Sequence, residues 1–367
     1  MIEKVEVVNG AIPLTETEPR QQWVDEWSFQ LYVKVSAGGR TGWGEILPSA
    51  GSTREPYAAL VNRLAPAIQG KDESEIGDLW NLMRRLTFSG GYGVTTGAIS
   101  GIDIALWDLK AQKAGRSLSE LLGGKHRRVG RYASLSRYPR AADAAAAVGR
   151  LLDQGYASIK LHQSGKDSLE TIGLVRKALG FGFDLAADLN CAFPYPKALD
   201  FMKKVHSKEL KWAEEPVWPP DDFDSLKKLN RVGPVAAGEN FFSFFEFERV
   251  MEMDALSLYQ PDIAKIGGVT PALDIIKLAK KHGARLAFHN RPDNGWVSTI
   301  GSAHLASALS PRALVETPPN EVPREYFSFQ GSMDKTTITP GGKGLGVAPL
   351  GSIPTSTGSK MLVFHER

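Results

Sequence analysis

Three acidic residues in the middle of the chain lie at the ends of short apolar runs. The runs are LAADLN, LKWAEEP and PVAAGEN, and their acids are Asp188, Glu214 and Glu239. The acids are 26 and 25 residues apart, close to the roughly 30 residues of one strand–helix–strand unit. This regular spacing predicts that all three lie at the same end of neighbouring parallel strands. In a parallel barrel, that end is the catalytic face.

The same three acids predict a metal site. Converging carboxylates raise one another's pKa, so they do not stay ionised together without a cation between them. Oxygen ligands alone suit a hard ion, Mg²⁺ first and Mn²⁺ second. Any one of these acids would also fit a salt bridge or a helix cap, but their common position in a repeating unit favours the metal.

Other predicted strands also end in chemically useful side chains. SIKLH places Lys160 and His162 two residues apart, on one face of a strand. Asp262 follows the strand in LYQPD, and His289 ends the next strand in RLAFHN. An adjacent carboxylate would fix the tautomer of this imidazole and raise its basicity. Glu316 ends the last strand, in ALVETPP. Each residue, taken alone, would also fit a core position, a helix cap or a solvated surface.

Together these groups suit removal of a proton from the carbon next to a carboxylate. The resulting enediolate carries two negative oxygens, which a metal ion and Lys160 would neutralise. His289 and the Lys160/His162 pair belong to strands that are far apart in order. We therefore expect them on opposite faces of the substrate carbon.

The hydrophobic pattern changes from an α+β unit to alternating strands and helices. Apolar–polar alternation in residues 2–9 and 28–36, followed by TGWGEI, predicts an antiparallel meander, and helices are expected after it. Eight strands are then predicted, at residues 129–134, 157–162, 183–189, 210–214, 234–238, 256–261, 285–289 and 313–316. With helices between them, they favour a parallel (β/α)7–8 barrel over a doubly wound sheet.

Composition limits the class of protein. The 44 basic and 41 acidic residues give a net charge of +3, which argues against a nucleic-acid partner. Cys191 is the single cysteine, so no intramolecular disulfide forms and a reducing cytoplasm fits. The first residues do not resemble a signal peptide, and no apolar run approaches the ~18 residues of a membrane span. We expect a cytoplasmic protein without a membrane partner.

Taken together, the motifs resemble the enolase superfamily, in its mandelate racemase/muconate lactonizing enzyme branch. DLN, EEP and GEN resemble its metal-ligand motifs, and QPDIAKIGGVT with AFHN resembles the Asp–His dyad of the mandelate racemase subgroup. SGIDIALWDLKAQKAGRSLSELLGG resembles the segment that joins its cap and barrel, and GWGE resembles part of its cap meander. The resemblance implies Asp188, Glu214 and Glu239 as Mg²⁺ ligands, with Glu215 as second choice. It implies that Glu316 hydrogen-bonds the enediolate.

The resemblance also implies the domain organisation. We expect a modified TIM barrel with an N-terminal α+β cap domain at residues 1–124 and a barrel at residues 125–325. A C-terminal segment, residues 326–367, would pack back on the cap and complete it. A homo-oligomer is expected on the same basis.

One motif departs from the family. Its usual Lys-x-Lys is here Lys160-Leu161-His162. Histidine has an ordinary pKa of about 6.5 against about 10.4 for lysine, and a shorter reach. This weakens the case for racemisation by two opposed bases, and His162 would instead serve as a base, an acid or a partner of a substrate hydroxyl.

Family members with an Asp–His dyad are, by resemblance, mostly acid-sugar dehydratases. We therefore expect a Mg²⁺-dependent hydro-lyase that converts an aldonic or aldaric acid into a 2-keto-3-deoxy acid. The alternatives are a racemase or epimerase of a 2-hydroxy acid, a lactone cycloisomerase, and a non-catalytic protein that binds sugar acids.

Substrate selection is expected from loops over the barrel mouth. Candidate substrate contacts are Arg20, Trp23, Arg54, Asn190 and Trp296. Arg291 is a further candidate, because an arginine binds the distal carboxylate of a diacid through paired hydrogen bonds. Ordinary loop positions are the simpler interpretation of each.

Overall fold

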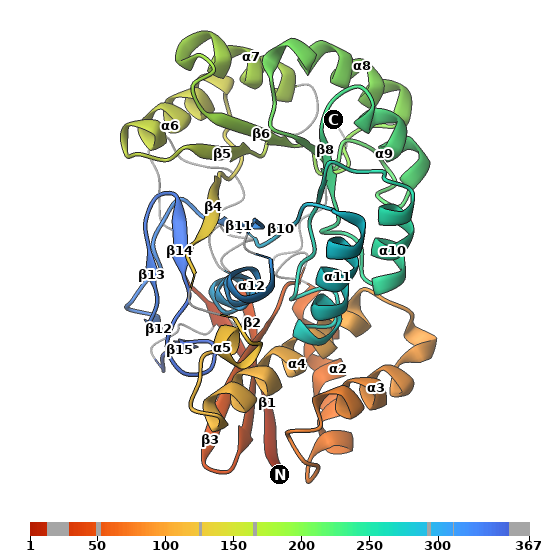
Figure 1. Cartoon of the computed structure of the whole chain (residues 1–367), viewed down its shortest axis with the longest axis vertical. Helices are drawn as coiled ribbons and strands as arrows, with labels where there is room; N and C mark the ends of the chain where they lie inside the picture. The colour runs from red at the N-terminus through yellow and green to blue at the C-terminus, as the bar shows by residue number, and fades with distance from the viewer. Residues whose placement is uncertain are drawn as a thin grey trace.

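The computed structural model describes residues 1–12, 29–48, 53–124, 127–163, 167–291, 295–310 and 312–351. Two predicted substrate contacts, Arg20 and Trp23, lie outside these residues. An N-terminal α+β unit occupies one end of the molecule and a parallel barrel the other (Figure 1). This is the fold class that the sequence predicted.

The N-terminal unit is an antiparallel sheet covered by helices. Its strands pair in the order β1, β2, β3. The elements are β1 (Ile2–Ala11), β2 (Phe29–Ala37), β3 (Arg40–Ile46), α2 (Arg54–Ile68), α3 (Ile76–Leu86) and α4 (Val94–Lys113). Leu31, Val33 and Val35 lie on one face of β2 and pack with α2 and α4 in a buried cluster. A Cβ on Gly44 of β3 would clash with the carbonyl oxygen of Gly101, so glycine allows α4 to approach the strand.

The barrel contains all eight predicted parallel strands. They are β4 (Val129–Ser134), β5 (Ser158–Leu161), β6 (Asp184–Asp188), β7 (Ala213–Glu214), β8 (Val235–Ala237), β9 (Leu258–Tyr259), β10 (Ala287–Phe288) and β11 (Leu314–Thr317). Their order is β10-β11-β4-β5-β6-β7-β8-β9. A parallel bridge between Tyr259 and Leu286 joins the two ends of this order. Several strands are shorter than predicted, because the apolar runs continue into the loops.

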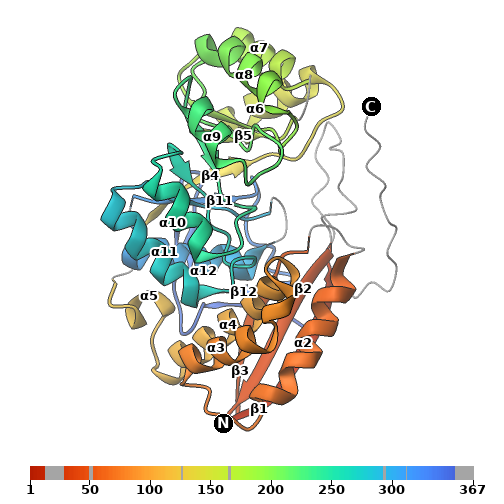
Figure 2. The same ribbon diagram turned by 90° about the vertical axis from the view of Figure 1, so that its right-hand side faces the viewer.

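Seven helices of the described chain alternate with these strands and surround the barrel (Figure 2). They are α6 (Ala141–Asp153), α7 (Asp167–Leu179), α8 (Tyr195–Val205), α9 (Phe223–Asn230), α10 (Phe244–Glu252), α11 (Val269–His282) and α12 (Trp296–Leu309). Inside the strands, Ala186, Ala236 and Ala287 surround two large rings, Tyr132 and Trp212. These rings meet edge to face at 5.2 Å. Small residues on three strands therefore make room for two aromatic side chains beneath the barrel mouth.

The last described strands contact both parts of the molecule. They are β12 (Phe327–Phe329), β13 (Ser332–Met333), β14 (Thr337–Thr339) and β15 (Val347–Pro349). Strand β14 pairs antiparallel with β4 of the barrel. The backbone N–H of Leu345 donates to Asp108 of α4, at 2.8 Å. The short helix α5 (Leu118–Leu121) leads from the N-terminal unit to the barrel.

Two buried carboxylates of the N-terminal unit cap helices of the barrel. Asp103 of α4 accepts hydrogen bonds from the backbone N–H and the hydroxyl of Thr270, at 3.0 and 2.5 Å, in the first turn of α11. Glu45 of β3 accepts from the backbone N–H and the hydroxyl of Ser298, at 2.9 and 3.2 Å, in the first turn of α12. A negative group at a helix N-terminus satisfies otherwise unpaired N–H groups and complements the helix dipole.

Glycine precedes both of these helices, at Gly268 and Gly295, and supplies no capping side chain. Gly268 has a φ of 101°, and a Cβ there would clash with the Asp103 carboxylate. Burial raises the pKa of Asp103 to about 7 and that of Glu45 to about 8. Because α11 and α12 follow the strands that carry the predicted dyad, the N-terminal unit helps to fix the barrel mouth.

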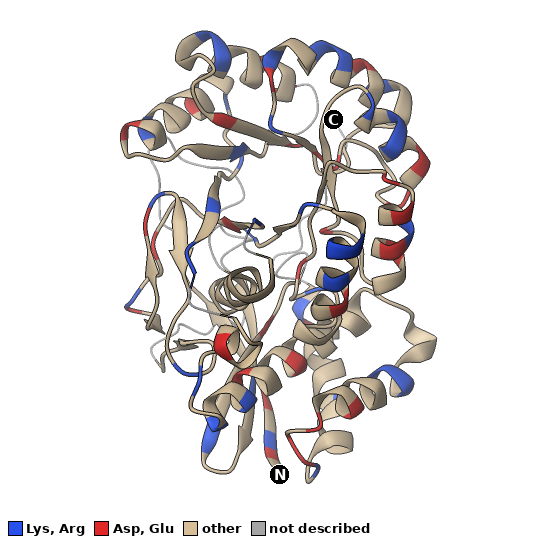
Figure 3. Ribbon diagram, viewed as in Figure 1, with Lys and Arg blue, Asp and Glu red and all other residues tan. Residues whose placement is uncertain are grey.

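Basic and acidic residues both occur along the outer helices (Figure 3). The mixture of both signs follows from the nearly equal numbers of basic and acidic residues, which give a net charge of +3. No helix in the described ranges combines the length and apolar character needed to cross a membrane.

The raised pKa of Asp103 predicts a pH-dependent stability. Because this pKa is about 7 in the folded protein against an ordinary 3.8, the folded state holds the proton more tightly. The contribution of Asp103 to the free energy of unfolding therefore declines as pH rises from about 4 to about 7. Asp103→Asn removes this effect and can still accept from one N–H and donate to the Thr270 hydroxyl. Urea titrations of metal-free protein should show the wild type losing about 2–3 kcal/mol relative to the variant between pH 5 and pH 8.

Asp274→Asn, on the exposed part of α11, is the matched control and should follow the wild type. Identical pH profiles for the wild type and Asp103→Asn would contradict the raised pKa.

Candidate active site

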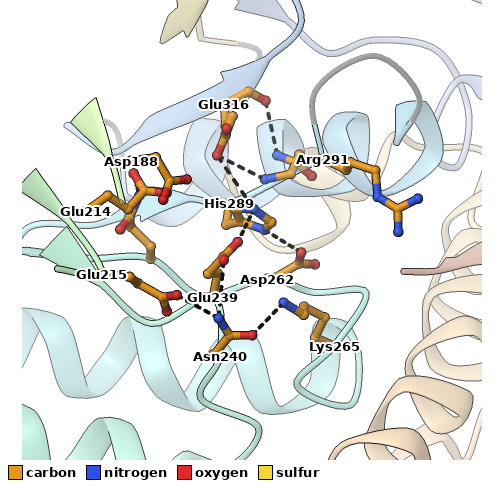
Figure 4. A network of polar contacts seen from close by, with 12 residues as sticks. Asp188, Glu214, Glu215, Glu239, Asn240, Asp262, Lys265, His289, Arg291 and Glu316 are labelled. Carbon is orange, nitrogen blue, oxygen red and sulfur yellow. Dashed lines mark hydrogen bonds and ion pairs between the residues drawn. The ribbon is translucent and has the colours of Figure 1, made fainter. Parts of the chain in front are cut away.

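The three acids predicted to bind metal come together at one end of the barrel (Figure 4). Asp188 and Glu214 end the neighbouring strands β6 and β7 and are paired in register, and Glu239 follows β8. Their exposed fractions are 0%, 0% and 8%. The regular spacing in sequence therefore corresponds to neighbouring side chains in space.

Lys160 of β5 is the positive centre of this group. Its Nζ lies 2.5 Å from Glu214, 2.8 Å from Glu316 and 3.2 Å from Asp188. Burial alone would lower the pKa of Lys160, but these three carboxylates raise it well above its ordinary value. Lys160 therefore stays an ammonium ion and holds together acids from three different strands.

His162, directly after β5, lies on the same side of the barrel. Its Nε2 is 3.0 Å from Asp188, and its Nδ1 is 2.6 Å from the carbonyl oxygen of Leu135. A proton on Nδ1 satisfies the carbonyl, which assigns Nε2 as the nitrogen directed at the acids. The Ser134 hydroxyl also lies 3.4 Å from Nδ1, so this nitrogen contacts neutral groups, where a carboxylate would raise its basicity.

Glu214 is held by two further side chains that the sequence analysis did not assign to the site. Its second oxygen accepts from Trp212 Nε1 at 2.9 Å and from Gln260 Nε2 at 2.6 Å. Both residues stand two positions before a predicted site acid, Glu214 or Asp262, and period-two alternation puts such pairs on one face of a strand. This two-residue spacing is the sequence feature that could have identified Trp212 and Gln260 as site residues.

Asp262 and His289 form the predicted pair. Nδ1 of His289 lies 2.7 Å from Asp262, which is 1% exposed, and Nε2 contacts Glu239. Burial alone would lower the pKa of His289, but the charges of Glu239 and Glu316 and the hydrogen bond to Asp262 raise it well above 6.5. The imidazole therefore has one nitrogen fixed by a carboxylate and the other directed toward the acids.

Glu316 of β11 completes the ring of side chains. One oxygen accepts from the Tyr132 hydroxyl at 3.0 Å and from the Asn290 N–H at 3.5 Å. The other makes an ion pair with Lys160 that lacks hydrogen-bond geometry. Tyr132 was not predicted, although it lies directly beside Glu316 in the register of β4 and β11.

The site holds more negative than positive charge. Six carboxylates are buried here: Asp188, Glu214, Glu215, Glu239, Asp262 and Glu316. Two lysines and two histidines face them: Lys160, Lys265, His162 and His289. If all six acids were ionised, two negative charges would remain in excess even with both imidazoles protonated. The metal-free site relieves this excess by protonation, because burial and the neighbouring acids raise the pKa of Glu214 well above its ordinary value. Burial and the neighbouring acids raise the pKa of Glu215 to about 8.

This donor set fits a divalent cation. One oxygen of Glu215 is buried without a hydrogen-bond partner among the described residues, and all the nearby oxygens are hard ligands suited to Mg²⁺. The acids lie against Lys160 and His289, and no group of the described residues is already arranged as a coordination sphere. Ligation by Asp188, Glu214 and Glu239 therefore stays a prediction.

The predicted substrate contacts lie in different surroundings, some exposed and some buried. Asn190 is exposed with a φ of 42°, and its N–H donates to Asp188 at 2.9 Å. The Arg54 guanidinium is buried against the Phe29 ring, at 4.4 Å. Trp296 begins α12 and is 2% exposed, within the core. Their roles toward a substrate remain predictions.

Arg291 makes contacts that the sequence analysis did not foresee. Its guanidinium donates to the carbonyl oxygens of Phe29, at 3.4 Å, and Pro48. In Figure 4 it is turned away from His289. The side chain connects the barrel to the start of β2 and the segment after β3, and its contact with a substrate carboxylate stays a prediction.

Comparisons with known proteins find matches to related families in both the N-terminal unit and the barrel. A family model described as "Enolase C-terminal domain-like" matches residues 143–351, and one described as "Mandelate racemase / muconate lactonizing enzyme, N-terminal domain" matches residues 13–123. D-galactonate dehydratase of Variovorax paradoxus is 31% identical over 273 residues, 71% of each chain.

Two solved structures are similar over nearly their whole length. L-talarate dehydratase from Polaromonas sp. JS666, complexed with Mg and L-glucarate, is 26% identical with a TM-score of 0.81 and covers 96% of both chains. The 3,6-anhydro-D-galactonate cycloisomerase from Zobellia galactanivorans is 26% identical with a TM-score of 0.82. That match covers 95% of this chain and 96% of the other.

The excess negative charge predicts stabilisation by divalent cations. Mg²⁺ or Mn²⁺ should raise the melting temperature of chelator-treated protein, because a ligand bound only by the folded state adds about 2.7 kcal/mol at a concentration of 100 times its dissociation constant. Calorimetry with and without MgCl₂, at constant ionic strength with NaCl, measures this. Glu239→Gln should abolish most of the effect. An equal response to Na⁺ and Mg²⁺ would contradict the predicted site.

Proposed function

Because the chain belongs to the mandelate racemase/muconate lactonizing enzyme family of the enolase superfamily, we propose that it is a Mg²⁺-dependent sugar-acid dehydratase. The proposed reaction removes water from an aldonic or aldaric acid and yields a 2-keto-3-deoxy acid. The observation that carries the proposal is the buried Asp262–His289 pair, which faces a group of carboxylates with excess negative charge. The D-galactonate and L-talarate dehydratases similar to this chain support the reaction class.

In this proposal Asp188, Glu214 and Glu239 hold the metal ion. When bound, Mg²⁺ supplies Lewis-acid stabilisation of the negative charge that develops on the substrate carboxylate. The charge excess of the site and the unpaired oxygen of Glu215 support this assignment.

The chain's own residues supply the proton transfers and a further positive charge. Lys160, an ammonium ion among carboxylates, provides a fixed positive charge next to the developing enediolate. His289 donates from Nδ1 to Asp262, so its Nε2 is the atom that takes or gives a proton. Engagement of Glu239 with the cation would free this nitrogen from its present contact.

The proton and electron balance is simple. The bond between the α carbon and its hydrogen breaks, and the proton passes to a basic side chain. The electron pair forms the carbon–carbon double bond as the bond to the β-hydroxyl breaks, and a proton from His289 converts the leaving hydroxyl to water. The enol then becomes the keto acid. His289 can perform both proton transfers if the two groups leave from the same face.

The geometry favours this reaction over racemisation. A racemase needs two bases on opposite faces of one carbon. Lys160 is held as an ammonium ion by three carboxylates, and the partners of His162 Nδ1, the Leu135 carbonyl and the Ser134 hydroxyl, are neutral. His289, with Asp262 behind it, is the imidazole whose basicity a carboxylate supports. One strong base suits an elimination.

Ring opening of a sugar derivative is the second candidate. It also begins with removal of a proton next to a carboxylate, and the similar cycloisomerase structure favours it. For either reaction we predict a small-molecule acid as substrate, a cytoplasmic location and a homo-oligomeric assembly.

The proposal is tested with a panel of aldonic and aldaric acids and Mg²⁺. We expect a semicarbazide-reactive keto acid from at least one of them, with one solvent deuterium at carbon 3 when the reaction runs in heavy water. His289→Asn should lower kcat by about 10²–10⁴-fold, the usual contribution of a general acid–base group. The exposed His282→Asn is the matched control. Deuterium exchange at the α carbon without loss of water would instead indicate an epimerase.

A further inference from the structure

Asn240 lies at the centre of a polar chain that connects three loops at the barrel mouth (Figure 4). It follows Glu239 in the sequence, after β8. Lys265 comes from the segment between β9 and α11, and Glu215 directly follows β7. None of these three residues had a predicted primary role, and they meet beside Glu239.

The contacts assign the orientation of the Asn240 amide. Its Nδ2 donates to Glu215 at 2.6 Å and to Glu239 at 3.2 Å. Its Oδ1 accepts from Lys265 Nζ at 3.2 Å. The two N–H groups are thus directed at two carboxylates and the carbonyl at an ammonium ion, an arrangement that a flipped amide would reverse at every contact.

Glu215 is held in a conformation that needs support. Its φ is 40°, and that of its neighbour Cys191 is 55°. Residues other than glycine adopt this left-handed backbone conformation at a cost of about 1–3 kcal/mol each. Cys191 donates from its backbone N–H to the Glu215 carbonyl, at 2.8 Å, and from its thiol to the carboxylate, at 3.2 Å. Strain and donors therefore combine to direct a buried acid toward Asn240.

Lys265 supplies the positive charge in this set of polar contacts. Its ammonium group is half-buried, lies 5.8 Å from the centre of the Phe242 ring, and faces the amide oxygen of Asn240. Hydrogen bonds that involve charged partners are stronger than neutral ones. The positive charge of Lys265 polarises the amide, and the amide in turn fixes the two carboxylates.

We propose that Lys265, Asn240 and Glu215 are positioning residues that hold Glu239 in the orientation needed to bind the divalent cation. This inference rests on the proposed function, because it requires Glu239 to be a metal ligand. One oxygen of Glu239 accepts from Asn240, which leaves the other, now against His289, to face the cation. Groups that orient metal ligands through hydrogen bonds typically change metal affinity by 10–100-fold when removed.

Mn²⁺ binding to the full-length, chelator-treated protein tests the inference without any substrate. Free Mn²⁺ is followed by electron paramagnetic resonance as protein is added. Asn240→Ala and Lys265→Met should each weaken Mn²⁺ binding by 10–100-fold. Cys191→Ser, which retains a donor, should bind as the wild type does. Lys277→Met, an exposed lysine of α11 paired with Asp274, is the matched control and should also bind normally.

Melting temperatures measured in the presence of chelator distinguish a variant that no longer orients Glu239 from a variant that no longer folds. Lys265→Met removes a half-buried charge and should remain folded even if Asn240→Ala does not. Folded Asn240→Ala and Lys265→Met with wild-type affinity would overturn the inference while leaving the proposed function intact. A wild-type protein that binds no Mn²⁺ would overturn the proposed function itself.

Discussion

Repulsion among buried carboxylates determines how the mouth of this barrel is built. Six acids from the ends of five strands meet at one end of the barrel, and each is at most 8% exposed. Burying ionised groups is costly unless they are paired. The fold meets this cost with Lys160 at the centre, with the two histidines, and with neutral donors such as Trp212 and Tyr132. With all six acids ionised, two negative charges would be in excess, and a divalent cation would balance them.

The same constraint explains why the site is held so firmly. A cation site of this kind requires carboxylates to be fixed against their own repulsion. Donors for the acids come from strands, loops and side chains on several sides: Trp212 and Gln260 for Glu214, Tyr132 for Glu316, and Asn240 for Glu239. From the N-terminal unit, Asp103 and Glu45 cap the helices that follow Asp262 and His289. The N-terminal unit therefore helps to set the position of His289, the proposed base.

Much of this arrangement could be predicted because a β/α barrel repeats itself. Asp188, Glu214 and Glu239 share one phase of the repeat, so sequence spacing translated directly into proximity. What could not be predicted depends on contacts between distant segments. The caps on α11 and α12 come from residues more than 150 positions away, and the local sequence at Gly268 shows only a glycine before a helix.

Arg291 illustrates the same limit. An arginine two residues beyond His289 was a candidate for binding a substrate carboxylate, since sequence does not reveal which acceptors surround a guanidinium. In the fold it meets backbone carbonyls at the start of β2 and in the segment after β3. Trp212 and Gln260 were missed for a related reason, because a buried indole or amide becomes part of a site only through the oxygen that it contacts.

Crystals grown with Mn²⁺ and measured at the manganese absorption edge test the central claim most directly. We predict one strong anomalous peak within about 2–2.5 Å of oxygens from Asp188, Glu214 and Glu239. A peak bound by other residues, or none at Mn²⁺ concentrations that saturate related sites, would contradict it.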